Sequence, residues 1–81
     1  MKEHIYETQG TCSRAIRIVL ADDGTIADVQ FAGGCHGNLQ GIAALVRGQK
    51  PEAVADRLEG IQCGMKGTSC PDQLSKALRN L

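Results

Sequence analysis

The sequence predicts a small α+β domain in which a three-stranded antiparallel sheet is followed by about three helices packed on one of its faces. In the first third of the chain, apolar residues alternate with polar ones, which is the period of a half-buried strand. In the rest of the chain they recur three and four residues apart, which is the period of an amphipathic helix. Strands that come first and helices that come afterwards favour helices segregated to one face of the sheet.

Three strands are expected before residue 33. The runs that carry the strand pattern are residues 3–8, 14–20 and 25–32. The first alternates only weakly, whereas the second and third each place three apolar side chains on one face, namely Ile16, Ile18, Leu20, Ala27, Val29 and Phe31. Asp23-Gly24 lies between these two runs, and an Asp-Gly pair favours a tight hairpin. The expected sheet is therefore an antiparallel meander with one buried face.

Three helices are expected after residue 33. The first ends near Gly48 and carries an apolar stripe that consists of Leu39, Ile42, Ala43 and Val46. Pro51 opens a second, shorter helix that runs to about Leu58. A glycine-punctuated loop over residues 60–69 comes next, and Pro71 opens the third helix, whose stripe consists of Leu74, Ala77, Leu78 and Leu81. No repeat or linker interrupts this order, so residues 1–81 are expected to form one domain.

The balance of charges excludes several classes of function. Nine basic and nine acidic residues cancel, and no basic stripe is present, so we expect no binding to nucleic acid or to an anionic membrane surface. No apolar run approaches the roughly 20 residues that span a bilayer, and residues 1–5 lack the apolar stretch of a secretory signal. We therefore expect a cytoplasmic protein, in which cysteines serve as ligands or redox thiols more often than as structural disulfides.

The four cysteines, Cys12, Cys35, Cys63 and Cys70, each lie in a predicted turn that contains glycine. Glycine allows the backbone to approach an ion closely, and a core this small favours a metal or covalent staple. With Pro71 as the first helical residue, Cys70 is the N-cap, and Cys35 precedes the first helix. A helix N-terminus favours the thiolate that metal ligation needs. The sequence therefore predicts one metal ion, with zinc as the expected metal, held by these four thiolates.

Other interpretations of these residues stay open. Any of the cysteines can be a small buried apolar residue, and paired disulfides are a further alternative. His36 is either a fifth ligand or a hydrogen-bonding neighbour of the turn. Asp72, in the first turn of its helix, is explained by the helix dipole or by a catalytic role.

Residues 68–72 read Thr-Ser-Cys-Pro-Asp, the motif after which the TSCPD domain family is named. Residues 33–39 and 60–64 look like that family's other signatures, so the resemblance covers nearly the whole chain. TSCPD domains occur at the C-terminus of adenosylcobalamin-dependent ribonucleotide reductases and as short free-standing proteins, and this chain resembles the second kind. The resemblance implies metal binding by the same four cysteines and ribonucleotide reductase or another protein as the partner. It also implies the label of a ribonucleoside-diphosphate reductase.

Ribonucleotide reduction itself needs a large barrel that holds a radical cysteine, a nucleotide and a reducing thiol pair. Eighty-one residues are too few to build it. We therefore expect no enzyme activity from the chain alone, but a non-catalytic accessory role in deoxynucleotide and DNA synthesis. A monomer or a small homo-oligomer is expected.

A more distant resemblance concerns the U-type iron–sulfur scaffold proteins, and it implies the SufE/NifU-like fold. The order of strands and helices agrees, and three scaffold cysteines match Cys12, Cys35 and Cys70. The scaffolds carry an aspartate where this chain has Arg14 and a histidine where it has Ser69. Cys63 has no scaffold counterpart and would complete a closed four-thiolate site, which is typical of a structural metal.

The residues thus support three competing functions. The leading one is a zinc-binding module without catalysis. The second is an iron–sulfur cluster scaffold or carrier, which the order of the elements favours. The third is a thiol-redox partner of ribonucleoside-diphosphate reductase, with Cys63 and Cys70 as the redox pair.

Overall fold

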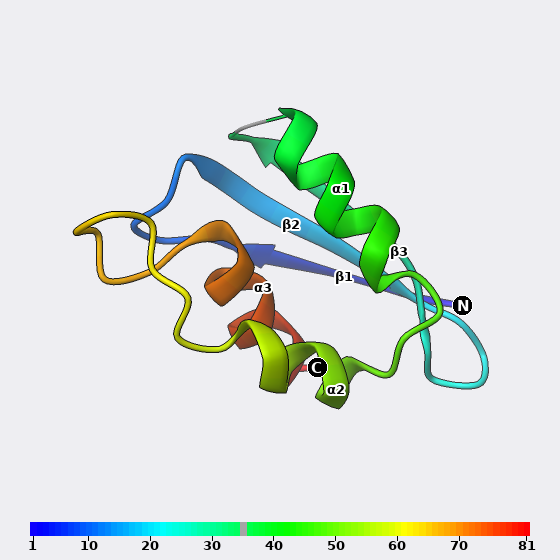
Figure 1. The fold of residues 1–81 in the computed structure, drawn as a ribbon. Helices are drawn as coiled ribbons and strands as arrows, with labels where there is room; N and C mark the ends of the chain where they lie inside the picture. The colour runs from blue at the N-terminus through cyan, green and yellow to red at the C-terminus, as the bar shows by residue number, and fades with distance from the viewer. Residues whose placement is uncertain (35) are drawn as a thin grey trace.

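The computed structural model describes residues 1–34 and 36–81 and confirms the predicted α+β architecture. In that part of the chain, three strands precede three helices (Figure 1), in the order β1 (Lys2–Glu7), β2 (Ser13–Leu20), β3 (Ile26–Gly33), α1 (His36–Val46), α2 (Pro51–Leu58) and α3 (Cys70–Arg79). The predicted ligand Cys35 lies outside the described residues. Among the helices just given, none combines the length and the apolar character that crossing a bilayer requires.

The sheet is the predicted antiparallel meander, with β2 in the centre and β1 and β3 on either side. The turn between β2 and β3 closes where the Asp-Gly pair predicts it. Gly24 has a φ of 86°, and its N–H donates to the carbonyl of Ala21 at 2.9 Å. The carboxylate of Asp23 accepts bonds from the N–H and the hydroxyl of Thr25 at 3.0 and 2.7 Å.

Two predicted core positions differ from the structure. Ile26 and Asp28 pair with consecutive residues of β2, so Ala27 between them forms a bulge. The bulge turns both Ile26 and Val29 toward the core, where they are 1% and 2% exposed, while Ala27 is only half-buried. Leu81, predicted to continue the stripe of the third helix, lies beyond the end of α3 and is 44% exposed.

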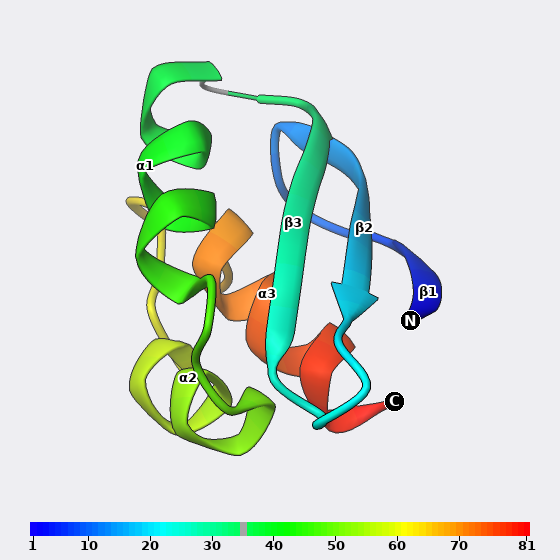
Figure 2. The ribbon, with the colours of Figure 1, turned by 90° about the vertical axis from the view of Figure 1, so that its right-hand side faces the viewer.

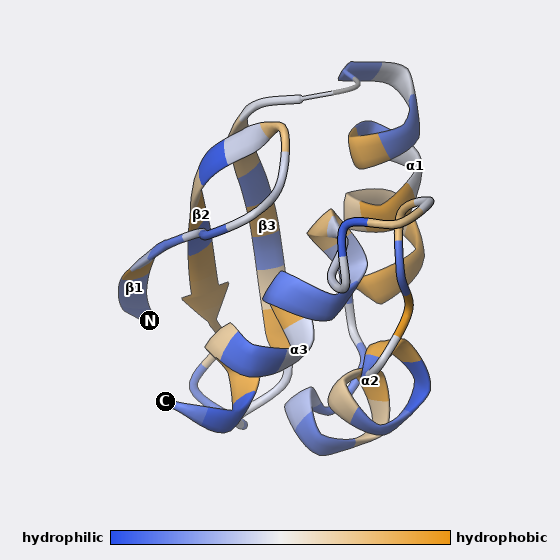
Figure 3. Cartoon of the chain, turned by 90° about the vertical axis from the view of Figure 1, so that its left-hand side faces the viewer, coloured by the Kyte–Doolittle hydropathy of each residue, from blue (hydrophilic) through white to orange (hydrophobic). Residues whose placement is uncertain are grey.

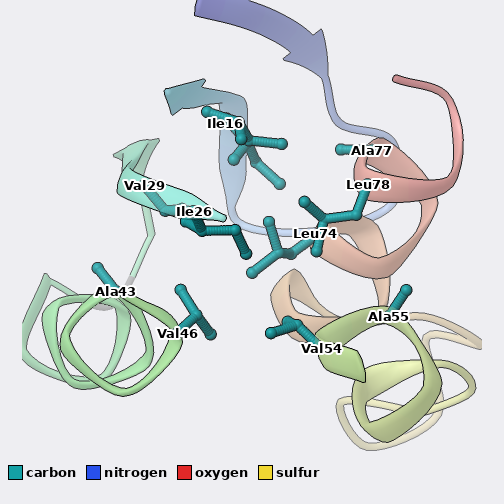
Figure 4. Packing of buried hydrophobic residues seen from close by; sticks show 11 residues of the cluster. Ile16, Ile26, Val29, Ala43, Val46, Val54, Ala55, Leu74, Ala77 and Leu78 are labelled. Carbon is teal, nitrogen blue, oxygen red and sulfur yellow. The ribbon is translucent and has the colours of Figure 1, made fainter. Parts of the chain in front are cut away.

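The helices lie on one face of the sheet, as predicted (Figure 2). α1 packs against β3, α3 packs against β2, and α2 packs against α3. Hydrophobic residues follow β2 and α1 (Figure 3), and side chains from the sheet and the helices point toward one another in the core (Figure 4). The buried members of this core are Ile16, Ile18, Ile26, Val29, Ala43, Val46, Val54, Ala55, Leu74, Ala77 and Leu78.

Shortening one core side chain by a methyl group tests this packing. Ile18 is fully buried in the central strand, opposite Val29. Ile18→Val is expected to lower the free energy of unfolding by about 1 kcal/mol, which shifts Tm by about 4–8 °C in a domain of this size. Ile5→Val makes the same chemical change at a residue that is 62% exposed, and it should leave Tm nearly unchanged. Equal shifts in the two variants, measured by thermal unfolding, would contradict the assignment of the core.

Candidate functional site

Two of the predicted ligands meet at the start of β2 and the start of α3. Cys12 immediately precedes β2, and Cys70 is the first residue of α3. Their Sγ atoms are 3.8 Å apart although the residues are 58 positions apart in sequence. Cys12 is exposed, whereas Cys70 is 7% exposed. The structure thus brings one exposed and one buried thiol into direct contact.

The N-cap of α3 is Ser69, one residue earlier than predicted. Ser69 has extended backbone with a φ of −153°, and its Oγ accepts the N–H of Asp72 at 3.1 Å. The same hydroxyl donates to the carbonyl of Ile61 at 2.6 Å. The prediction of Cys70 as the N-cap was therefore wrong. Serine is a much better cap than cysteine because its oxygen accepts a hydrogen bond from a backbone N–H well. Cys70 nevertheless lies in the first turn, where the positive end of the helix dipole favours a thiolate.

Ser13 is a neighbour of Cys70 that the sequence analysis did not identify. Its Oγ lies 3.1 Å from the Sγ of Cys70, and its side chain is buried. Burial raises the pKa of the Cys70 thiol, but hydrogen bonds from the hydroxyl and backbone of Ser13, together with the Cys12 thiol, lower that pKa below its ordinary value. The only sequence signal for this role was the position of Ser13 directly after Cys12.

Cys63 lies in the loop between α2 and α3, and it lines a cavity together with Cys12 and Cys70. The loop closes on itself because the N–H of Cys63 donates to the carbonyl of Thr68 at 3.0 Å and the N–H of Lys66 donates to the carbonyl of Cys63 at 3.2 Å. Cys12, Cys63 and Cys70 together line an open cavity of about 520 Å³, which residues of α1 also line. The structure shows a sulfur contact between Cys12 and Cys70 but none between Cys63 and Cys70.

The cluster is incomplete in the part of the chain that the structure describes. Among residues 1–34 and 36–81, no three His, Cys, Asp or Glu side chains lie close enough together to hold a metal ion. Gly34 lies beside Cys12, since a Cβ added at Gly34 would lie 3.3 Å from the Sγ of Cys12. His36, the predicted fifth ligand, lines a separate groove between α1 and β3.

Asp72 holds the loop that carries Cys63 onto the start of α3. Asp72 is 4% exposed, and its two carboxylate oxygens accept hydrogen bonds from the N–H of Gly60 at 2.7 Å and the hydroxyl of Thr68 at 2.5 Å. The Nζ of Lys76 lies 3.6 Å from the Oδ2 of Asp72. The hydrogen bond from Thr68 and then that from Gly60 hold the pKa of this carboxyl below its ordinary value. The helix dipole therefore explains only part of the role of Asp72. Its carboxylate also clamps both ends of this loop, through Gly60 and Thr68.

Gln73 joins the segment of Cys12 to the segment of Cys70. Its amide nitrogen donates to the hydroxyl of Thr68 at 3.0 Å, and its amide oxygen accepts the backbone N–H of Gln9 at 3.1 Å. Gln73 is 3% exposed. Its bond to Thr68 is buried, and its bond to Gln9 is part-buried. Because Gln9 and Gln73 each lie three residues from a cysteine of the pair, this contact helps to set the distance between the two sulfurs.

The sulfur geometry fits one edge of a tetrahedral thiolate site. Four thiolates at about 2.3 Å from a zinc ion have their sulfurs about 3.8 Å apart, and the Cys12–Cys70 distance is 3.8 Å. Both thiols face a cavity that Cys63 also lines. The donor set is entirely sulfur, which suits zinc or an iron–sulfur cluster and does not suit magnesium or calcium.

A family model described as TSCPD domain matches residues 2–81. Comparison with curated proteins and comparison with solved structures gave no match. The likeness to the iron–sulfur scaffold fold therefore stays a prediction.

Proposed function

The chain belongs to the TSCPD domain family, and from that premise we propose that it is a zinc-binding module that serves ribonucleotide reduction as a non-catalytic accessory. In this proposal Cys12 and Cys70 form one edge of the site. Cys63 joins them from the loop that Asp72 clamps, and Cys35 supplies the fourth thiolate. A zinc ion bound by four thiolates acts as a cross-link, which a core of this size needs.

The contact between the Cys12 and Cys70 sulfurs supports this proposal more than any other observation. Two thiols that share no ion gain little from such proximity, because a thiol is a weak hydrogen-bond donor and acceptor. Here the pair lies at the start of a helix and beside the hydroxyl of Ser13, and both features favour the charged form of Cys70. The residues around the pair thus prepare a thiolate that a metal ion can bind.

The non-catalytic role follows from the same donor set. A zinc ion with four protein ligands has no open position for a substrate or water, whereas catalytic zinc keeps one. The link to ribonucleotide reduction rests on the family resemblance alone, through the occurrence of TSCPD domains at the C-terminus of adenosylcobalamin-dependent reductases.

Elemental analysis together with an absorption spectrum tests the metal. Protein purified without added metal and kept reduced is expected to contain about one equivalent of zinc per chain and no visible absorption. His36→Ala is the control, because His36 lines a different groove, and it should retain the same zinc content. Less than about half an equivalent in both proteins would contradict the zinc site. A brown protein that contains iron and sulfide would favour the scaffold or carrier function instead.

Addition of the chain to a purified adenosylcobalamin-dependent reductase tests the accessory role. The rate of deoxynucleotide formation is expected to change when the zinc-loaded chain is added, while the chain alone forms no product. The control is the chain heated until it is unfolded. If the rate is the same with folded, unfolded and no added chain, and no complex is detected by gel filtration, the accessory role is wrong while the zinc site still stands.

A further inference from the structure

We propose that Cys12 and Cys70 are also a redox-active dithiol, which closes to an intramolecular disulfide by exchange with a small-molecule disulfide such as glutathione disulfide. The pair uses two thiols of the proposed metal site, but the exchange does not require a bound ion. The sequence had pointed to Cys63 and Cys70 for such a role. The structure assigns it to Cys12 and Cys70 because, among the three cysteines that it describes, these two have their sulfurs in contact, at 3.8 Å.

The distance between the sulfurs makes closure feasible. A disulfide needs an S–S distance of about 2.05 Å, so the two Sγ atoms must approach by about 1.8 Å. Cys12 lies in the loop before β2, and Cys70 lies in the first turn of α3, where side-chain rotation moves the sulfur without disturbing the helix. Gln73 holds the two segments at this spacing through its bond to Gln9. The chain thus keeps both thiols within reach of one another.

The different exposure of the two thiols assigns their order of reaction. Cys12 is exposed and meets the external disulfide first, whereas Cys70 is 7% exposed and is covered by its neighbours. In the first step the Cys12 thiolate attacks one sulfur of the disulfide RSSR, which forms Cys12–S–SR and releases RS⁻. In the second step the Cys70 thiolate attacks the Cys12 sulfur, which forms the Cys12–Cys70 bond and releases a second RS⁻. Two electrons pass from the protein thiols to RSSR, and the two thiol protons leave to water or to RS⁻.

Cys63 serves as an internal comparison within the same molecule. It is exposed like Cys12 and lines the same cavity, but the structure shows no sulfur contact between it and Cys70. A mixed disulfide that forms on Cys63 should therefore persist, whereas one that forms on Cys12 should be resolved within the molecule. This difference separates directed closure from unspecific oxidation of exposed thiols.

Disulfide mapping of the metal-free chain tests the proposal. The reduced protein is treated with a chelator, equilibrated with mixtures of glutathione and glutathione disulfide, quenched with an alkylating reagent and digested for mass spectrometry. The main intramolecular disulfide is expected to join Cys12 to Cys70, with Cys63 alkylated or carrying glutathione. The oxidised chain should also unfold at a higher Tm than the reduced one, because the bond closes a long loop. A main disulfide that involves Cys35 or Cys63 instead, or none at all, would overturn the assignment.

Two variants test the order of reaction. In Cys70→Ser, glutathione should accumulate on Cys12 because the resolving thiol is missing. In Cys12→Ser, the reaction of Cys70 with glutathione disulfide should be at least about tenfold slower, since burial limits access to thiolates. Equal reactivity of Cys12 in Cys70→Ser and of Cys70 in Cys12→Ser would overturn the assigned order. The mapping of the unmodified chain does not depend on whether these variants fold.

A parallel experiment with one equivalent of added zinc separates this inference from the proposed function. If zinc binds through the same thiols, it should slow the formation of the Cys12–Cys70 disulfide several-fold. If that disulfide forms at the same rate with and without zinc, the dithiol stands and the zinc site is wrong. If zinc binds but the metal-free chain never forms that disulfide, the zinc site stands and the dithiol is wrong.

Discussion

Cys70→Ser is expected to weaken zinc binding by about 100-fold or more. Replacing a residue that only hydrogen-bonds to a ligand already lowers metal affinity by about 10- to 100-fold. A serine hydroxyl stays protonated near neutral pH and supplies no anionic sulfur to the ion. Serine is otherwise close in size to cysteine and keeps the hydrogen bond that Ser13 makes at this position. Competition with a chromophoric chelator of known zinc affinity measures the loss.

The paired variant and a control make this test specific. Cys12→Ser should cause a loss of similar size, because the two sulfurs are proposed to share one ion, whereas His4→Ala lies on β1 and should cause none. Circular dichroism of the metal-free variants shows whether each still folds. If only one of the two cysteines affects zinc affinity, the shared site is wrong. If neither does, the ion, where present, is bound elsewhere.

Asp72→Ala is expected to lower the free energy of unfolding of the metal-free chain by about 2–3 kcal/mol. The substitution leaves the buried hydroxyl of Thr68 and the part-buried N–H of Gly60 without their acceptor. Because the metal would add its own binding energy to the folded state, urea unfolding is measured after treatment with a chelator. Asp56→Ala is the control, since the side chain of Asp56 is 71% exposed and its ion pair with Arg79 lies at the surface. Its expected loss is below about 1 kcal/mol, and equal losses in the two variants would contradict the clamp.

The same carboxyl makes stability depend on pH. The pKa of Asp72 is lowered in the folded state from an ordinary value of 3.8 by the bonds from Thr68 and Gly60. The contribution of Asp72 to the free energy of unfolding is therefore fully present above the pKa of this carboxyl in the unfolded state. It is lost as the pH falls through the lower pKa of the folded state. Asp72→Asn should remove this part of the acid sensitivity. If the slope of stability against pH below 3.8 is the same in the variant and the unmodified chain, the assignment is wrong.

Local patterns in the sequence were sufficient to predict the order of strands and helices. The Asp-Gly pair located the hairpin because a turn depends on a few adjacent residues. The bulge at Ala27 was not predictable in the same way, since it depends on how two strands align and not on the alternation within one. The N-cap of α3 is Ser69 and not Cys70, a difference of one residue that lies within the usual uncertainty of a helix end.

In the candidate site too, the local sequence indicated the cysteines but not the distant residues that contact them. The structure brings Cys12 and Cys70, two of the four predicted ligands, into contact. The bonds of Gln73 to Gln9 and of Ser13 to Cys70 join residues that are 64 and 57 positions apart, and no local pattern marks such partners. Glutamine and serine are also common surface residues, so neither residue was distinguishable before the fold was known.

The bond between Gln73 and Gln9 also fixes when the sulfur pair can form. It joins the loop before β2 to α3, so a ribosome must synthesise the chain through Gln73 before both partners are present. Cys12 is synthesised 58 residues before Cys70. Any ion or oxidant that acts on the pair therefore acts after Cys70 has been synthesised, and a nascent chain arrested before residue 70 does not contain the pair.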